Sequence, residues 1–312
     1  MVSALEQAVQ DYTAGSPVEP GRLWTNRSPA ELARELAGQG HPVAPKTVQR
    51  MLKEDLGLSR RQMAKTLSMG ESADRDAQFH ELEKIKAEFL EQGFPVVSVD
   101  TKKKELLGKF YRSGPAWTNG RIRAWDHDFP SSAWGKVIPY GVYDLARNEA
   151  LMYLAQGSDT AVLAVDALCR WWHRLGRRHY SADAPLLVLA DCGGSNGYRS
   201  PLFREGLQLL ANRLGKIIRV CHIPPYCSKY NPIDHRLFCH LSRSLKGLLL
   251  RSIEIIRQAI ERTTTSKGLN VITELARKVY PCGVKASPEY REHETVLRHA
   301  VLPQFNYQFV PH

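Results

Sequence analysis

Two short stretches decide the expected fold: VVSVD at residues 96–100 and LLVLAD at residues 186–191. Each is an apolar run with the length of a buried strand, and each ends in an aspartate, Asp100 or Asp191. A third acid, Asp234, lies in NPIDH at residues 231–235, where a proline favours the first turn of a helix. Rigid elements that end in a carboxylate are well suited to hold a metal ion. The three acids therefore predict a nuclease or strand-transfer site that uses Mg²⁺ or Mn²⁺.

The patterns around these stretches predict the element order β, β, β, α, β, α, β, α. The expected ranges are strands at 95–100, 140–145 and 150–155, a helix at 159–172, a strand at 186–190, a helix at 199–214, a strand at 217–223 and a helix at 232–245. This is the order of a ribonuclease-H-like α/β fold, a mixed sheet flanked by helices. Its first and fourth strands are neighbours, so Asp100 and Asp191 should meet at adjacent strand ends. The last helix should bring Asp234 to them.

The N-terminal part predicts a small all-α segment. Residues 1–27 are weakly patterned and are expected to be a lead-in. Ser28 and Glu31 have the spacing of a capping box, and a second helix is expected from about residue 45 to 56. The two helices predict a helix-turn-helix whose second helix contacts DNA; an ordinary helical hairpin is the alternative. The exposed side chains that would contact DNA are Lys46, Gln49, Arg50 and Lys53.

These elements divide the chain into four parts. Residues 1–70 are the expected DNA-binding segment with its lead-in, and 71–94 a linking helix that bridges the two domains. Residues 95–262 are the expected catalytic domain, and 263–312 a C-terminal extension. The linking helix should turn five apolar side chains inward: Phe79, Leu82, Ile85, Phe89 and Leu90.

The charge of the chain favours a polyanionic partner. The net charge is +11, and residues 199–262 hold twelve Lys or Arg and four Asp or Glu. Double-stranded DNA is the expected partner; a solvated basic face is the alternative. No apolar run approaches the roughly 18 residues that a membrane span needs, and the N-terminus does not have the pattern of a secretory signal. A cytoplasmic protein without a membrane partner is expected.

Two other kinds of site are disfavoured. The six cysteines include no CxxC pair, and the spacing of residues such as Cys221, His222 and Cys227 matches no common zinc module. The turn GGSNG at residues 193–197 could present backbone N–H groups to phosphate, but no Gly-Lys-Ser/Thr follows it. A nucleotide cofactor is therefore not expected.

The three acids have expected roles and expected neighbours. Asp100 is central and should bridge two cations, while Asp191 and Asp234 should each hold one. Asn196 either bonds to the site or turns the chain, and Glu105 is either a spare carboxylate or a surface partner of nearby lysines. His235 would support the acids, act as an acid or base, or pack. The cations expected to contact DNA near the site are Lys102, Lys103, Lys104, Lys229 and Arg236; a solvated charge run is the alternative for the three lysines.

Several strings resemble the DDE transposases of bacterial insertion sequences, in particular the ISAzo-thirteen group, which is distantly similar to Tc/mariner enzymes. They are SVDTKKKE at 98–105, HDF at 127–129, IPYGVYD at 138–144, ADCGGSNG at 190–197, NPIDHRLF at 231–238 and TTT at 263–265. The resemblance runs from about residue 25 to the C-terminus. It implies metal-dependent cleavage of transposon-end DNA and strand transfer into target DNA. It also implies the triad Asp100, Asp191 and Asp234, two Mg²⁺ ions that Mn²⁺ can replace, a homodimer on DNA, and a place at the bacterial nucleoid.

Two departures from the family pattern bear on activity. The third acid of the group is usually Glu, and here it is Asp234. Members also carry a further N-terminal DNA-binding segment, so the resemblance implies a truncated or split copy. Two alternatives follow: a ribonuclease-H-like nuclease without strand transfer, and a catalytically inactive remnant that binds DNA.

Overall fold

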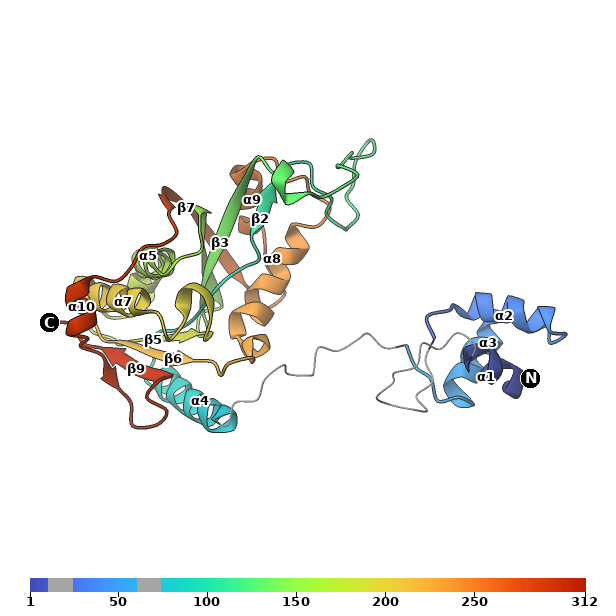
Figure 1. The fold of residues 1–312 in the computed structure, drawn as a ribbon, viewed down its shortest axis with the longest axis horizontal. Coiled ribbons are helices and arrows are strands. Elements are labelled where there is room, and N and C mark those ends of the chain that lie inside the picture. The colour runs from blue at the N-terminus through green and yellow to red at the C-terminus, as the bar shows by residue number, and fades with distance from the viewer. Residues whose placement is uncertain (11–24, 61–73) are drawn as a thin grey trace. The chain divides into compact units, whose positions relative to one another are not determined.

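The computed structural model describes residues 1–10, 25–60 and 74–312. It divides the chain into two units, Met1–Leu67 and Ser68–His312 (Figure 1). The expected boundary near residue 70 lies outside the described residues. No helix in the described ranges is long and apolar enough to cross a membrane.

The first unit contains α1 (Val2–Gln10), α2 (Pro29–Gly38) and α3 (Pro45–Glu54). The predicted capping box is confirmed: the Glu31 N–H donates to Ser28 Oγ at 3.3 Å, and the Ser28 N–H donates to a Glu31 carboxylate oxygen at 2.7 Å. Helix α3 buries Val48 and Met51. It leaves its polar side chains in solvent, as the sequence predicts: Lys46, Gln49, Arg50 and Lys53.

Residues 1–27 were expected to be a weakly patterned lead-in, but the first ten residues contain a helix that belongs to the core of the first unit. Helix α1 buries Leu5, Ala8 and Val9 in one core with α2 and α3. The three side chains recur at helical spacing and share one apolar face. That face is too short to stand out in the sequence, and only its packing against two other helices reveals it.

The second unit is built on one mixed sheet. Its nine strands in the described residues are β1 (Val96–Thr101), β2 (Glu105–Leu107), β3 (Gly135–Asp144), β4 (Glu149–Gly157), β5 (Leu186–Ala190), β6 (Ile218–His222), β7 (Asn270–Tyr280), β8 (Leu297–Arg298) and β9 (Asn306–Phe309). The spatial order is β7-β4-β3-β1-β5-β6-β9-β8, and β2 pairs with β3. Strands β1, β3 and β4 are antiparallel neighbours, whereas β1, β5 and β6 are parallel. The ribonuclease-H-like arrangement is confirmed, with the first and fourth strands of that fold (β1 and β5) side by side.

Helices cover both faces of this sheet (Figure 1). On one face α5 (Ala161–Trp171) and α7 (Pro201–Leu214) pack over the inward side chains of the central strands. On the other face lie α4 (Arg75–Glu91), α8 (Cys239–Ser244) and α9 (Ile253–Glu261). Shorter helical turns are η1 (Pro130–Ser132), η2 (Trp172–Gly176), α6 (Arg177–His179), η3 (Gly194–Asn196), η4 (Ser228–Tyr230), η5 (Asp234–Phe238) and α10 (Pro288–Glu292).

Helix α4 packs on the sheet of the second unit. Leu82 and Ile85 are buried against β1, β5 and β6, as predicted, but Leu90 is 37% exposed. Sequence periodicity missed two buried polar positions, Gln78 and Glu81; the Gln78 side chain donates to the carbonyl of His222 at 2.8 Å. A buried glutamine breaks the apolar pattern, so the face of the helix could not be read from hydrophobic residues alone.

Residues 263–312, expected to be an extension, add strands to the same sheet. β7 pairs in parallel with β4, and β9 pairs antiparallel with β6. The C-terminal region therefore supplies both outer parts of the sheet. Sequence patterning had no means of assigning these strands, because their partners lie far earlier in the chain: Asn270 of β7 pairs with Glu149, and Asn306 of β9 pairs with Cys221.

Candidate active site

Two acids meet where β1 and β5 end. The parallel register pairs Val99 with Ala190, so the following residues, Asp100 and Asp191, emerge at the same edge of the sheet. Asp100 is still within β1, whereas Asp191 is the first residue after β5. The adjacency that the element order predicted is thus set by backbone hydrogen bonding between two buried strands.

The third acid is fixed to β1 by buried hydrogen bonds just before it in sequence. Ser98 Oγ donates to Asn231 Oδ1 at 2.5 Å, and the Ile233 N–H donates to Ser98 Oγ at 3.2 Å. The Asn231 amide also donates to the Val99 carbonyl at 3.5 Å. Asp234 therefore begins its helical turn tied to the strand that carries Asp100. The asparagine uses its side chain for this attachment and does not cap the following helix.

A glycine makes this attachment possible. Gly141 on β3 lies directly opposite Asp100 in the antiparallel register. A Cβ at this position would lie 2.8 Å from Ile233 Cδ1 and 2.8 Å from Phe238 Cε1. The Asp234 segment therefore rests against bare backbone beside Asp100.

Burial raises the pKa of all three acids, and neighbouring carboxylates add to the effect at Asp100 and Asp191. Burial raises the pKa of Asp100 to about 7, and the charges of Asp191, Asp234 and Asp159 add to the effect. Burial likewise raises the pKa of Asp191 to about 6 and that of Asp234 above its usual value. The Thr101 N–H, which donates to Asp100 at 2.7 Å, acts in the opposite direction.

This donor set fits a hard divalent cation. All contributing groups are carboxylates, the ligands that Mg²⁺ prefers, and the charges of neighbouring acids raise the pKa of Asp100 and Asp191. Among the described residues no three His, Cys, Asp or Glu side chains form a ready-made cluster for one ion. The acids act on one another through their charges and do not converge on a single point.

Asn196 bonds to Asp191. Its side chain is buried, and its Nδ2 donates to Asp191 Oδ1 at 3.5 Å. Its Oδ1 accepts from the hydroxyls of Tyr140 and Ser195. Two hydroxyl donors fix the amide orientation, so the NH₂ group is the one that faces the carboxylate.

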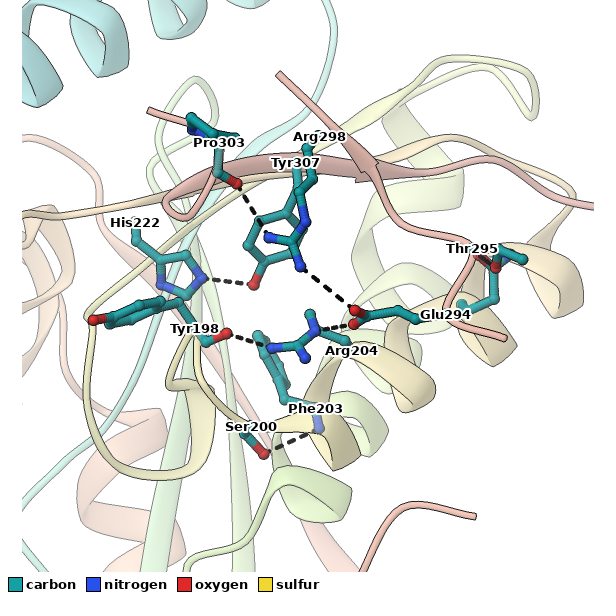
Figure 2. Close-up of polar contacts among 11 residues, drawn as sticks. Tyr198, Ser200, Phe203, Arg204, His222, Glu294, Thr295, Arg298, Pro303 and Tyr307 are labelled. Atoms are coloured by element: carbon teal, nitrogen blue, oxygen red, sulfur yellow. Dashed lines mark hydrogen bonds and ion pairs between the residues drawn. The ribbon is translucent and has the colours of Figure 1, made fainter. Parts of the chain in front are cut away.

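A buried histidine, His222, contacts the backbone of Asp191. His222 Nδ1 lies 2.8 Å from the Asp191 carbonyl oxygen. Its Nε2 lies 2.7 Å from the Tyr307 hydroxyl, a contact that Figure 2 shows. Burial lowers the pKa of His222 to about 4, so the ring is neutral. Because a carbonyl can only accept, Nδ1 carries the proton and Nε2 accepts from Tyr307.

Two of these neighbours were not predicted from sequence. Asp159 was regarded only as the start of a helix, yet it accepts from Thr101 Oγ1 at 3.0 Å and raises the pKa of both Asp100 and Asp191. His222 was weighed only as a zinc ligand. Its position at the end of the strand next to β5 was the available signal, but its partner Tyr307 lies on a strand that was not expected.

The lysine run after Asp100 differs from the expectation in part. Strand β1 ends at Thr101, so Lys102 and Lys104 do not share a strand face. Lys102 is 7% exposed and its Nζ lies 2.5 Å from Glu105, which Arg112 also contacts at 2.5 Å. Lys102 is therefore committed to an internal ion pair and is not a DNA contact. Glu105 pairs with one of the nearby lysines, as one of its two expected roles required, but at 4% exposure it is buried and not at the surface.

The remaining expected contacts are exposed. Lys103 and Lys104 lie in solvent beside the site, and so do Lys229 and Arg236. The exposed His235 bonds through Nε2 to the carbonyl of Lys229. Its charge acts to lower the pKa of Asp234, against the larger effect of burial.

Comparison with known proteins gives one sequence match and several structural ones. A search of curated proteins found no match. The structure of the Mos1 transposase paired-end complex with left transposon end is 15% identical, with a TM-score of 0.44, over 83% of this chain and 69% of that one. The Mos1 strand transfer complex is 16% identical, with a TM-score of 0.44, over 83% and 68%. The family described as Rhodopirellula transposase DDE domain matches residues 4–311. Because that match spans nearly the whole sequence, the chain belongs to this family of transposase DDE domains.

Proposed function

We propose that this chain cleaves DNA at the ends of an insertion sequence and joins them to target DNA, using Asp100, Asp191 and Asp234 to hold divalent cations. The observation that carries the proposal is the meeting of Asp100 and Asp191 at neighbouring strand ends, with Asp234 tied to the same strand through Ser98 and Asn231. Burial raises the pKa of all three carboxyl groups, and the charges of neighbouring acids raise those of Asp100 and Asp191 further.

The cations, two Mg²⁺ or Mn²⁺ ions, would activate the attacking oxygen and stabilise the leaving oxygen of the phosphodiester. The chain's own residues do the positioning. Asp100 would be the ligand shared by the cations, Asp191 and Asp234 would each hold one of them, and the amide of Asn196, which donates to Asp191, would keep that carboxylate turned toward the site. Asp159 adds negative charge beside Asp100 and Asp191, which strengthens the attraction for cations.

Double-stranded DNA is the proposed partner of both units. The exposed side chains of α3, above all Arg50 and Lys53, would contact one DNA segment, and Lys103 and Lys104 would contact phosphates beside the acids. Two copies of the chain, each on one transposon end, would act together at the bacterial nucleoid. Residues 1–70 would supply recognition, and the unit that follows would supply cleavage.

The first experiment is metal-dependent nicking of a supercoiled plasmid by the full chain, with Mg²⁺ and Mn²⁺ titrated separately. Asp100→Asn, Asp191→Asn and Asp234→Asn should each abolish nicking and keep DNA affinity. Asp126→Asn is the matched control, because that side chain is 93% exposed and lies outside the site. A triad variant that still nicks at the wild-type rate would remove that residue from the proposed site.

A second readout separates cleavage from joining. The plasmid carries the genomic DNA that flanks the coding sequence, where the element's ends would lie, and joined products are sequenced. Cleaved and joined ends support the proposal. Nicking without joining would favour a nuclease that lacks strand transfer, and DNA binding without nicking would favour an inactive remnant.

A further inference from the structure

A second polar site lies between α5, α7 and the edge strand β7. A cleft of about 330 Å³ is lined by five basic side chains: Arg170 and His173 at the end of α5 and just beyond it, Arg213 near the end of α7, and Arg277 and Lys278 on β7. We call these five residues the basic cleft. None of them belongs to the acid site or to the DNA contacts that the sequence predicts.

The positive charge of the basic cleft exceeds its negative partners. Lys278 pairs with Asp166 at 2.7 Å, and Arg170 pairs with Glu274 at 3.5 Å. Arg213 and Arg277 have no carboxylate partner among the described residues, and Arg213 contacts only the thiol of Cys169, at 3.9 Å. Two exposed guanidinium groups are therefore available to a ligand.

The pKa of His173, the histidine in the basic cleft, also indicates an excess of positive charge there. Burial lowers the pKa of His173, and the charges of Arg177, Arg213 and Arg170 lower it further. No acid is among the causes that act on it. The field at this position is therefore positive, as a site for an anion requires.

The basic cleft is connected to the acid site through α5. The helix begins at Ala161, two residues after Asp159, and Arg170 follows nine residues later. At 1.5 Å per residue this separation is about 14 Å along the helix, which corresponds to roughly four base pairs of duplex at 3.4 Å each. A duplex engaged at the acids is long enough to reach the cleft.

We infer that the basic cleft binds the phosphate backbone of the DNA on which the chain acts, away from the point of cleavage, with Arg213 and Arg277 as the principal contacts. The planar guanidinium fork matches a phosphate in two-point contact, which a lysine ammonium does not. The inference rests on the proposed function for the identity of the ligand. The cleft contacts would hold the duplex in place without reading its sequence.

The test is the salt dependence of binding to a fluorescein-labelled 30-base-pair duplex of arbitrary sequence, in EDTA, with Arg213→Ala/Arg277→Ala in the full chain. Each phosphate contact contributes about 0.9 to the slope of log affinity against log salt, so the double variant should lower the slope by about 1.8. At 0.1 M salt this corresponds to a loss of up to about 60-fold in affinity.

Two controls make the result specific. Arg75→Ala/Lys84→Ala removes the same charge from exposed positions on α4, on the opposite face of the sheet, and should change the slope far less. Arg213→Lys/Arg277→Lys keeps the charge and should restore the slope while losing part of the affinity. Both arginines are exposed, and an unchanged melting temperature will establish that the variants fold.

The outcomes separate this inference from the proposed function. A double variant with the wild-type slope and affinity overturns the inference, even if the chain nicks DNA. A reduced slope in a protein that fails to nick supports the cleft and refutes the catalytic proposal. A chain that binds no duplex at all refutes both, and would leave an acidic protein segment as the ligand for the cleft.

Discussion

Replacing Gly141 by alanine should separate the third acid from the other two while leaving DNA binding intact. The added Cβ would lie 2.8 Å from both Ile233 Cδ1 and Phe238 Cε1. Ordinary contacts of this kind are about 3.5–4.0 Å long, so the segment that carries Asp234 must move by roughly 1 Å. Both contacting side chains are buried, at 0% and 6% exposure, and cannot simply rotate into solvent.

The expected size of the effect follows from that displacement. A misplacement of about 1 Å at a reacting centre can lower the rate about 100-fold. Overpacking of a core typically costs about 1–3 kcal/mol, which lowers the melting temperature by about 2–4 °C per kcal/mol in a domain of this size. Plasmid nicking should therefore fall about 100-fold, while the affinity for duplex DNA stays within twofold.

The assay compares initial nicking rates in Mn²⁺ with the melting temperature of each variant. Gly135→Ala is the matched control, because it lies on the same strand and its Cβ would meet Leu107 at an ordinary 3.5 Å. Ile233→Val removes the Cδ1 atom that clashes, so adding it to Gly141→Ala should recover part of the rate. A Gly141→Ala protein that nicks at the wild-type rate would refute the packing of the Asp234 segment against β3.

Four further outcomes are expected. Glu105→Gln leaves the buried ammonium of Lys102 without its negative partner, so the melting temperature should fall by an amount equivalent to about 3 kcal/mol. The control Glu91→Gln changes an exposed residue and should leave the melting temperature unchanged. Because Asp100 and Asp191, with pKa values of about 7 and 6, keep protons in the folded state that the unfolded chain releases, the metal-free chain should lose stability as pH rises from about 4 to 8. In thermal melts across that range, Asp100→Asn should lose less stability than the wild-type chain, because it lacks the buried carboxyl group that must release a proton. Asp234→Glu should keep or raise nicking activity, and its complete loss would mean that the site is built around the shorter acid. Arg50→Ala/Lys53→Ala should weaken duplex binding and flatten its salt dependence; an unchanged slope would make α3 a packing element.

The features that sequence predicted were those with a local cause. The capping box of Ser28 and Glu31 involves residues three apart, and the strands that lead to Asp100 and Asp191 are continuous apolar runs. Their adjacency followed from element order, because a chain that alternates strands and helices after a hairpin has few ways to close a sheet.

The features that sequence missed depend on contacts that a linear pattern does not show, most of them with residues far along the chain. Lys102 was expected to contact phosphate beside the acids. Strand β1 ends at Thr101, and Lys102 is instead buried against Glu105. Asn231 has the residue type of a helix cap, but the buried Ser98 hydroxyl offered a stronger partner. His222 could not be placed without Tyr307, which lies on the last strand.

That last strand has a consequence for the order in which the protein is made. During synthesis the N-terminal parts of a chain leave the ribosome first, so all three acids emerge well before β9. The tyrosine that bonds to His222, and through it supports the backbone of Asp191, lies on β9 and therefore emerges after all three acids. A nascent chain that has not yet made β9 would carry its acids on an incomplete sheet. The support of Asp191 by His222 would be completed only once β9 has left the ribosome.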